Sequence, residues 1–575
     1  MTARARLALA ALLTTLAALP ALFAPWDEDE VFLLGAVRGT SPWMNGPLEA
    51  YRFSSGEPAE VAARVATGAF PWYVAPDFKY ALFRPLASAL LWVDAHLGAG
   101  RLGAQVHALV WHAALVVAGG WLLERALRTL PGATRAVALF LFATSIAHTT
   151  PTAWLTARHV LVGVVPVLVA CILHVRGAEE RRRGFALGAA GLVLVGLLGS
   201  EAGAQAIGYL VAYELTRVGP LGARARRLAP LGAVVIGYAA LYVALGRGHA
   251  YGSALAASVG SFVTVGLPRG LVHAVVLLGV SLRPDNAWGY DALRETVLVV
   301  PCVLALAWLG LRRMESEARR DVAWLALGGV LAIVPALGAP LESRVLVAPS
   351  LGAAAIVAVA LGEGLRAVRA RSWIVAGAAV PVALVHLVLA PIELPLHYVA
   401  IGRARDARFG AFVRATRAGD GERDLLVVGA PHFLYGQLGG YLRERATGVR
   451  EGRWVPLADA NCAHRVDRPA VDRLAVTPRC PEGFFPYGRP DVGDEVQQLG
   501  RTIRVVSAAP ELRFEVRFAG PIEDARVALV TFEGFADRRV AVPAVGEHLD
   551  LAAPAPPELL GLDAPTRWLH ARFDP

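Results

Sequence analysis

The sequence predicts a mostly α-helical protein that crosses a membrane many times and ends in a small mixed domain rich in β-strand. Two observations predict this fold class. The 575 residues have a mean hydropathy of +0.49 and 18% charged residues, whereas soluble proteins carry about 25%. The apolar residues also fall in long blocks, as bilayer spans do, and these blocks stop near residue 390.

Eleven apolar blocks are predicted to span the bilayer. The first, 6–24, follows a basic start; a signal peptide is the alternative, but no cleavage site followed by a soluble domain comes after it. The other ten blocks are 104–123, 136–149, 159–175, 184–199, 203–216, 229–245, 295–311, 322–339, 345–361 and 372–390. The apolar block 83–98 is short and contains Asp94, so we expect a helix that lies at the membrane interface.

The positive charge is almost entirely arginine, since the chain has one lysine, Lys79, and a net charge of +9. With eleven spans and the N-terminus inside, every arginine cluster between the blocks falls on the cytoplasmic side, as the positive-inside rule requires. These clusters are 2–6, 124–135, 176–183, 217–227, 312–320 and 366–371. Nucleic acid is not an expected partner, because no basic stripe is interleaved with aromatic residues.

This arrangement predicts a multi-pass protein of the cell inner membrane with its C-terminal part on the extracytoplasmic (periplasmic) side. The predicted domains are a membrane domain, 1–390, and a mixed β-rich domain, 391–575. The segments expected outside the membrane on that same side are 25–103, 150–158, 200–202, 246–294 and 340–344. Strands are expected in the C-terminal domain at 424–430, 501–507, 511–518 and 525–532.

Cys462 and Cys480 both lie in the predicted extracytoplasmic domain. An oxidising compartment favours a disulfide between them, with Cα atoms roughly 4.4–6.8 Å apart. Two free thiols in a cytosolic domain are the alternative. Cys171 and Cys302 lie inside apolar blocks and are expected to be inert.

The strongest candidate site is the acid run Asp27, Glu28, Asp29 and Glu30, directly after the first block. On its own such a run is more often the solvated flank of a span. Further ionisable or aromatic residues are expected on the same face, and together they mark a cavity with carboxylates and arginines. These residues are His107, Trp154, Arg158, Glu201, Glu342 and Arg344.

Carboxylates and arginines together suit glycosyl transfer. A carboxylate can take the proton of an acceptor hydroxyl, and burial near other acids raises its pKa towards useful base strength. Arginine forks bind a phosphate leaving group. No GxxxxGK[ST], HExxH or CxxC segment is present, which excludes a P-loop ATPase and the common zinc patterns.

Six segments in order resemble the bacterial relatives of protein O-mannosyltransferases, including those that carry tetratricopeptide repeats. The segments are DEVFLL at 29–34 (with Asp27-Glu28 as a competing register), FRPL at 83–86, AQVHALVWH at 104–112, HTTPTAWLTAR at 148–158, LLGSE at 197–201 and ESRVLVAPSLG at 342–352. The chain departs from the family pattern by lacking its Asn in the third segment, its Glu in the fourth and its Lys in the fifth. No tetratricopeptide repeat follows the spans.

The resemblance implies a GT-C glycosyltransferase fold. It implies an enzyme that moves a sugar from a polyprenyl-phosphate-linked donor in the lipid bilayer to a protein, lipid or glycan acceptor at the outer membrane face. Asp29 is then the catalytic base or acceptor-orienting acid, with Glu30 or Asp27 beside it. The implied donor-binding residues are Arg84, Arg158 and Arg344 for the phosphate, Glu201 and Glu342 to orient those arginines or the sugar, and His107 and Trp154. No cofactor is implied; a divalent metal at the acid run is an open alternative that the sequence does not predict.

Two alternatives come from other function classes. A lipid-sugar flippase or transporter would explain Pro335, Pro349 and Pro381, but it predicts charges in mid-span and an internal repeat, and the sequence contains neither. A non-catalytic envelope scaffold would use the β-rich domain to bind a partner. The sugar and the acceptor are not specified by the sequence.

Overall fold

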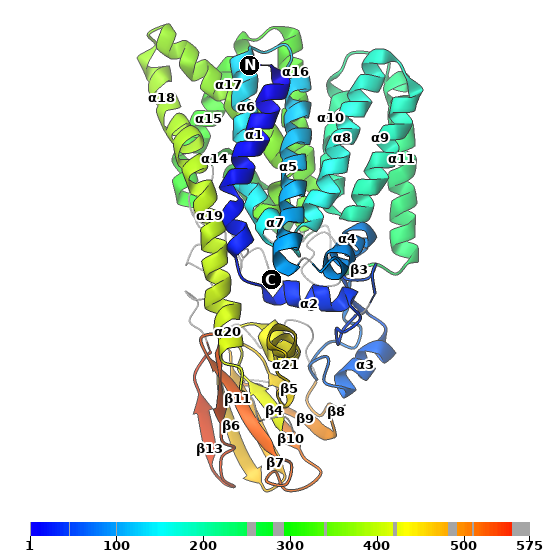
Figure 1. Cartoon of the computed structure of the whole chain (residues 1–575), viewed down its shortest axis with the longest axis vertical. Helices are drawn as coiled ribbons and strands as arrows, with labels where there is room; N and C mark the ends of the chain where they lie inside the picture. Colours follow the sequence, from blue (N-terminus) through cyan, green and yellow to red (C-terminus); the bar gives the residue numbers. More distant parts are fainter. Residues whose placement is uncertain are drawn as a thin grey trace.

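The computed structural model describes residues 2–44, 46–98, 100–249, 260, 262–279, 293–338, 342–417, 423–480, 491–508 and 511–554. Figure 1 shows two layers, with a bundle of helices above and the β-rich C-terminal domain below. The short helices α2 (Glu28–Val37) and α4 (Pro85–His96) lie between these layers. The mostly helical membrane protein with a β-rich C-terminal region is therefore confirmed.

The helical layer is built from apolar helices, most of which pack on one continuous core. Its helices are α1 (Ala3–Ala17), α5 (Gly100–Ala126), α6 (Gly132–Ala143), α7 (Thr149–Ala153), α8 (His159–Glu180), α9 (Arg183–Gly199), α10 (Ala202–Thr216), α11 (Leu221–Ala244), α14 (Leu267–Gly279), α15 (Leu293–Arg313), α16 (Ser316–Ile333), α17 (Pro349–Arg369) and α18 (Trp373–Ala383). Within the described ranges, 8 helices are long and apolar enough to cross a membrane, or 9 if the bent pair α6–α7 is one span. The predicted number of eleven is not reproduced, because helices such as α9 and α10, of 17 and 15 residues, are short for a bilayer.

All six arginine clusters lie at one end of the helical layer, which we call the basic end. Ion pairs and one close approach between helices connect them. Glu124 pairs with both Arg6 and Arg135, at 2.7 and 3.2 Å. The other contacts are Arg125 with Glu179, Arg217 with Asp321 (2.7 Å), Thr129 with Asp321 (2.8 Å), Arg313 and Arg366 with Glu363, and Gly362 beside Thr134. The acid run lies at the opposite end, which we call the acid end (Figure 1).

The predicted loop 246–294 needs correction, because it contains an apolar helix, Phe262–Gly279. The neighbouring helices nevertheless limit its topology. Helix α11 finishes at the acid end, where Arg247 pairs with Glu49 at 2.8 Å, and α15 runs back to the basic end. The chain between α11 and α15 therefore makes no net crossing. Residues 250–259, 261 and 280–292 of this predicted loop lie outside the described residues.

The last helical stretch, Trp373–Arg414, runs for 42 residues from the basic end into the C-terminal domain. It comprises α18, η6 (Leu384–Leu389), α19 (Ala390–Arg405), η7 (Asp406–Gly410) and α20 (Ala411–Arg414). The predicted domain boundary at residue 390 falls inside this stretch. The two layers are thus joined by helix rather than by a loop.

The C-terminal domain contains two sheets. In the first, β4 (Asp424–Val428) pairs in parallel with β5 (Arg453–Ala458) and β11 (Val527–Glu533), and β12 (Ala536–Val540) lies antiparallel at the edge; α21 (Phe433–Thr447) connects β4 to β5. The second has the order β13-β6-β7-β10-β9-β8, with β6 Ala463–Ala470, β7 Arg473–Arg479, β8 Glu495–Gln498, β9 Arg501–Ser507, β10 Arg513–Arg517 and β13 His548–Leu551. The run Leu425–Val428 is apolar throughout and buried on both sides, as suits a central parallel strand, whereas β10 alternates. The four predicted strand runs coincide with β4, β9, β10 and β11.

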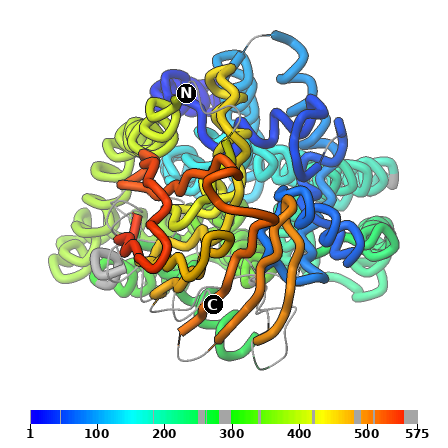
Figure 2. Tube along the Cα trace, turned by 90° about the horizontal axis from the view of Figure 1, so that it is seen from below, coloured from blue at the N-terminus to red at the C-terminus, as the bar shows by residue number. Residues whose placement is uncertain are grey.

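The segment 25–103 packs on the C-terminal domain rather than forming a separate loop. It contributes α3 (Pro58–Ala66) and, with β3 (Gly248–His249), a small sheet of β1 (Arg52–Ser55) and β2 (Lys79–Ala81). The Trp72 indole donates to the Leu457 carbonyl at 2.9 Å, and Gln498 donates to the Phe70 carbonyl at 2.9 Å. One apolar core therefore runs through α2, this segment and the C-terminal domain. We call these parts together the outer unit; Figure 2 shows its strands lying across the end of the helices.

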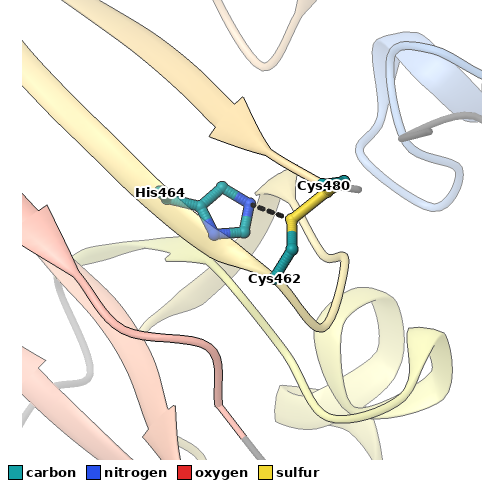
Figure 3. Close-up of a disulfide and its surroundings, with 3 residues drawn as sticks. All are labelled: Cys462, His464 and Cys480. Carbon is teal, nitrogen blue, oxygen red and sulfur yellow. Dashed lines mark hydrogen bonds between the residues drawn. A yellow bond between two sulfur atoms is a disulfide. The ribbon is translucent and has the colours of Figure 1, made fainter. Parts of the chain in front are cut away.

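The structure contains the Cys462–Cys480 disulfide that the sequence predicts, with Cα atoms 5.1 Å apart. It joins the start of β6 to the end of β7, two neighbouring antiparallel strands in which Ala463 faces Arg479. Figure 3 shows His464 beside the bond, with its Nε2 3.9 Å from the Cys462 sulfur.

Candidate active site

The acid run forms the first turn of α2. Asp27 is the N-cap, and its Oδ1 accepts a hydrogen bond from the Asp29 N–H at 3.2 Å. In the opposite direction, Glu30 Oε2 accepts from the Asp27 N–H at 3.3 Å. This is a capping box, and the negative charges in the first turn also interact favourably with the positive end of the helix dipole. The sequence DEDE is thus a helix start as well as a cluster of carboxylates.

Asp27 and Glu30 are buried and fully engaged in the structure. Arg405 of α19 contacts both, through Nη1 to Glu30 Oε1 at 3.1 Å and Nε to Asp27 Oδ2 at 3.6 Å. Glu30 also accepts from the Leu155 N–H at 3.0 Å, and Arg101 lies 3.7 Å from its other oxygen. These two acids therefore hold α2 in place and have little capacity left for a substrate.

Glu28 is buried against the C-terminal domain, and burial together with the charge of Asp27 raises its pKa to about 7. The positive charge of Arg408 and the Tyr435 hydroxyl act in the opposite direction. Glu28 therefore faces away from the bulk solvent and towards the C-terminal domain.

Asp29 is the one member of the run that is only half-buried. Among the described residues, no side chain forms a hydrogen bond or an ion pair with its carboxylate. Burial, followed by the charges of Asp27 and Glu28, raises its pKa well above the usual range, while Arg344 lowers it. A carboxyl with a raised pKa and no bonded partner has the properties of a general base.

Arg344 lies beside this acid, in the short helix η5 (Ser343–Leu346). Its guanidinium stacks over the Trp154 ring, 5.1 Å from the ring centre, and its Nε pairs with Glu342. The Trp154 indole in turn donates to Asp27 Oδ1 at 3.2 Å. The aromatic platform thus fixes the arginine relative to the acid run.

Arg84, the N-cap residue of α4, has the same kind of environment. Its guanidinium lies 5.0 Å from the centre of the Tyr51 ring, and its Nε donates to Glu201 at 2.6 Å. Tyr51 is itself fixed by its hydroxyl, which donates to the Thr156 carbonyl at 3.0 Å. Among the described residues, the terminal nitrogens of Arg84 and of Arg344 make no hydrogen bond, so both guanidinium forks are available for a ligand.

Arg84 and Arg344 serve one common region. Their charges both lower the pKa of Tyr80, which burial raises, and Glu201 and Glu342 both act on the same phenol. Groups from four elements, namely β2, η5 and the starts of α4 and α10, therefore lie near Tyr80. The structure brings together six of the predicted site residues, namely Asp29, Arg84, Trp154, Glu201, Glu342 and Arg344.

Arg158 and His107 are engaged elsewhere. Arg158 is 2% exposed, pairs with Asp94 and donates to the Ala104 carbonyl at 3.1 Å. His107 contacts the other oxygen of Asp94 at 2.8 Å. This cluster fixes α4 to α5 and α8, and it engages both terminal nitrogens of the Arg158 guanidinium. The expected contact of these two residues with the donor stays a prediction.

Sequence reasoning missed five residues of this region. Tyr51 and Tyr80 have no local signal, since only the fold brings them near the arginines. Asp94 was visible as an acid in an apolar block. Arg405 and Arg408 were visible as basic residues directly after the last span, on the side where the positive-inside rule predicts few.

A mostly apolar cavity lies next to Arg344, between α6, α14, η5 and α17. Ser343 lines it beside the site, and the remaining wall is largely aliphatic: Leu141, Ile146, Val276, Leu277, Leu346 and Val357. The polar groups of the site thus adjoin an apolar space inside the helical layer. No group of three His, Cys, Asp or Glu side chains arranged to hold a metal occurs among the described residues.

No protein-family model matches the sequence, and no curated protein matches it. The fold is similar to the Archaeoglobus fulgidus oligosaccharyltransferase in the apo form, with 12% identity and a TM-score of 0.42, over 78% of this chain and 64% of that one. It is also similar to ArnT from Cupriavidus metallidurans bound to undecaprenyl phosphate, with 14% identity and a TM-score of 0.36, over 78% and 88% of the two chains. A third similar structure is the arabinofuranosyltransferase AftD from Mycobacteria, with 19% identity and a TM-score of 0.32, over 75% of this chain and 31% of that one. The chain spans less than two thirds of the length of the archaeal enzyme, and similarities at this level do not place it in a family.

Proposed function

We propose that the protein is an integral-membrane glycosyltransferase that moves a sugar from a polyprenyl-phosphate-linked donor to an acceptor hydroxyl at the acid end. The observation that carries the proposal is the environment of Asp29. This acid is half-buried, has no bonded partner among the described residues and has a raised pKa. It lies beside Arg344, one of two stacked arginines with free forks.

In the proposed reaction, the Asp29 carboxylate takes the proton of the acceptor hydroxyl. The acceptor oxygen bonds to the anomeric carbon of the sugar as the bond from that carbon to the phosphate oxygen breaks. The leaving prenyl phosphate gains negative charge, which Arg84 and Arg344 stabilise through bidentate contacts. Glu201 and Glu342 keep the two guanidinium groups oriented.

The apolar cavity beside Ser343 suits the prenyl chain of such a donor. It lies within the helical layer and adjoins Arg344, so a phosphate held by the arginines would direct its lipid tail into apolar surroundings.

The main test is Asp29→Asn, assayed as sugar transfer from a polyprenyl-phosphate sugar in membranes. Asn keeps the shape but cannot accept the proton, so we expect about 10²–10⁴-fold less transfer. Asp27→Asn is the matched control, and it should be milder because Asn caps a helix about as well as Asp. Full activity in both variants would mean that the acid run only holds α2 in place, and the scaffold alternative would then be preferred.

We further propose that the basic end faces the cytoplasm and that the outer unit lies on the extracytoplasmic side of the inner membrane. The shared location of all six arginine clusters supports this. Arg182 is exposed at the basic end, and Val471 is exposed in the C-terminal domain. In intact cells, a membrane-impermeant thiol reagent should label Val471→Cys and leave Arg182→Cys unlabelled, with the unsubstituted protein as the blank. Labelling of Arg182→Cys alone would mean that the basic end, and not the outer unit, lies on the extracytoplasmic side.

A further inference from the structure

The charges around Asp29 come partly from a part of the chain that is remote in sequence. Arg405 closes α19 and Arg408 lies in η7, both in the long helix that leads into the C-terminal domain. Arg405 is 2% exposed and bridges Asp27 and Glu30, which are the N-cap and the third residue of α2. Asp29 lies between them in the same turn.

We propose that Arg405 and Arg408 are positioning residues for Asp29, so that the C-terminal domain is part of the catalytic unit. This inference rests on the proposed function. Arg405 fixes the first turn of α2 by holding its two ends, and Arg408 balances the charge of Glu28. Asp29 then remains the acid that is open to the substrate.

The C-terminal domain holds this helix through a buried ion network. Arg443 of α21 donates from Nε and Nη2 to the Phe412 carbonyl, at 3.1 and 2.8 Å. The same guanidinium pairs with Glu451 at 3.0 Å and with Asp537, and all three side chains are fully buried. Phe412 lies one turn after Arg408, so the network fixes the helix close to both positioning residues.

The C-terminal domain also contacts α2 directly. A Cβ atom placed on Gly35 would lie 1.6 Å from the Tyr441 hydroxyl of α21, so only glycine allows this approach. Tyr435 of the same helix lies next to Glu28. Helix α2 is therefore held from both ends, by α19 at its first turn and by α21 along its length.

The electrostatic consequence concerns Asp29. The charged groups that face it are Asp27, Glu28 and Glu30 on its own helix, Arg344 of η5 and Arg408 of η7. Removing the positive charge of Arg405 or Arg408 leaves three neighbouring acids less compensated. The carboxylate form of Asp29 then becomes harder to reach, and transfer should require a higher pH.

The test compares Arg405→Gln, Arg405→Lys and Arg408→Gln in the full-length enzyme with wild type. We expect Arg405→Gln to lower kcat roughly 10- to 100-fold, with little change in KM for the donor. The acid limb of its pH profile should move to higher pH. Arg405→Lys keeps the charge but loses the guanidinium fork. Compared with Arg405→Gln, it should therefore retain the wild-type pH profile and a larger part of kcat. Arg403→Gln is the matched control, an exposed arginine on the same helix that should leave both unchanged.

An unchanged kcat and pH profile in Arg405→Gln would overturn the inference. If Arg405→Gln does not fold, the pH profile and kcat of Arg408→Gln test the inference, because that variant leaves the bridge between Asp27 and Glu30 intact. If neither variant folds, the pH profile and kcat of Arg405→Lys test it. Asp29→Asn separates the two proposals. An active Asp29→Asn enzyme refutes the proposed function, whereas an inactive one together with a normal Arg405→Gln enzyme refutes only the positioning role.

Discussion

The two ends of the helical layer contain the same kinds of charged side chain and arrange them differently. At the basic end, Glu124 and Glu363 each hold two arginines, and Glu179 lies between Arg125 and Arg128. The acids there are outnumbered, and their pairs tie helix ends together. This arrangement fits a structural and topological role.

At the acid end, the balance is reversed. Asp27 and Glu30 share Arg405, Arg84 and Arg344 have one glutamate each and stack on aromatic rings, and Asp29 is left without a bonded partner among the described residues. Saturated pairs stabilise a fold, whereas an unsaturated carboxylate and two free guanidinium forks can act on a ligand. The difference shows that incomplete pairing, rather than charge alone, marks the site.

The largest expected effect is the pH dependence of Asp29. Its pKa is raised, and the proposed base is the ionised form, so transfer should fall as the pH falls through that raised pKa. The acid limb should therefore lie above the range of an ordinary aspartate. Asp29→Asn should abolish this limb and retain roughly 10⁻² to 10⁻⁴ of the rate. A limb that persists unchanged in the residual activity would assign it to another group.

The next effect concerns stability of the outer unit. Replacing Cys462 and Cys480 together by Ser opens a loop closed over a sequence separation of 18 residues. The chain-entropy model gives a loss of about 3 kcal/mol in the free energy of unfolding. Denaturant unfolding, followed by the fluorescence of the tryptophans of the outer unit, measures it. An unchanged unfolding midpoint would mean that the disulfide is dispensable for this region.

Arg84→Lys and Arg344→Lys test the free forks. Lys keeps the charge but loses the bidentate geometry and the stacking, so donor binding should weaken by about 1.5–3 kcal/mol, or roughly 10- to 100-fold. The readout is KM for the polyprenyl-phosphate sugar. Arg125→Lys, at the basic end, should leave KM unchanged. Equal increases in KM for variants at both ends would mean that the arginines of the acid end have no special role in donor binding.

The smallest effect comes from a matched pair of glutamates. Glu201 and Glu179 have side chains 34% and 30% exposed, and each pairs with an arginine, Arg84 and Arg125. Glu201→Gln should lower transfer about fivefold, because the orientation of Arg84 loses a contact of about 1 kcal/mol. Glu179→Gln removes an exposed structural pair and should change transfer by less than about twofold. Similar losses in both variants would indicate a general effect of charge.

The sequence came close to the site but not to its internal roles. Asp29, Trp154, Glu201, Glu342 and Arg344 were selected as residues at span ends on one face, Arg84 was selected from the family resemblance, and the structure brings all six together. Arg158 met the same criterion and is paired with Asp94, since position along the chain does not report which charges pair. Arg405 was overlooked, although an arginine cluster on the acid end is an exception to the positive-inside rule.

The sequence by itself determined that the protein is mostly helical with many apolar helices, the end at which the arginine clusters gather, the β-rich C-terminal domain and the candidate disulfide. These properties follow from hydropathy, alternation and composition, which are summed over residues that are neighbours in the chain. Only the tertiary structure decided that the segment 25–103 belongs with the C-terminal domain and that Asp29 is the acid left free. Those outcomes depend on contacts between residues such as Asp27 and Arg405, which lie near opposite ends of the membrane domain in sequence. Coulombic pairing and burial depend on distances in space, and sequence patterns over neighbouring residues do not report the distances between residues that are remote in the chain.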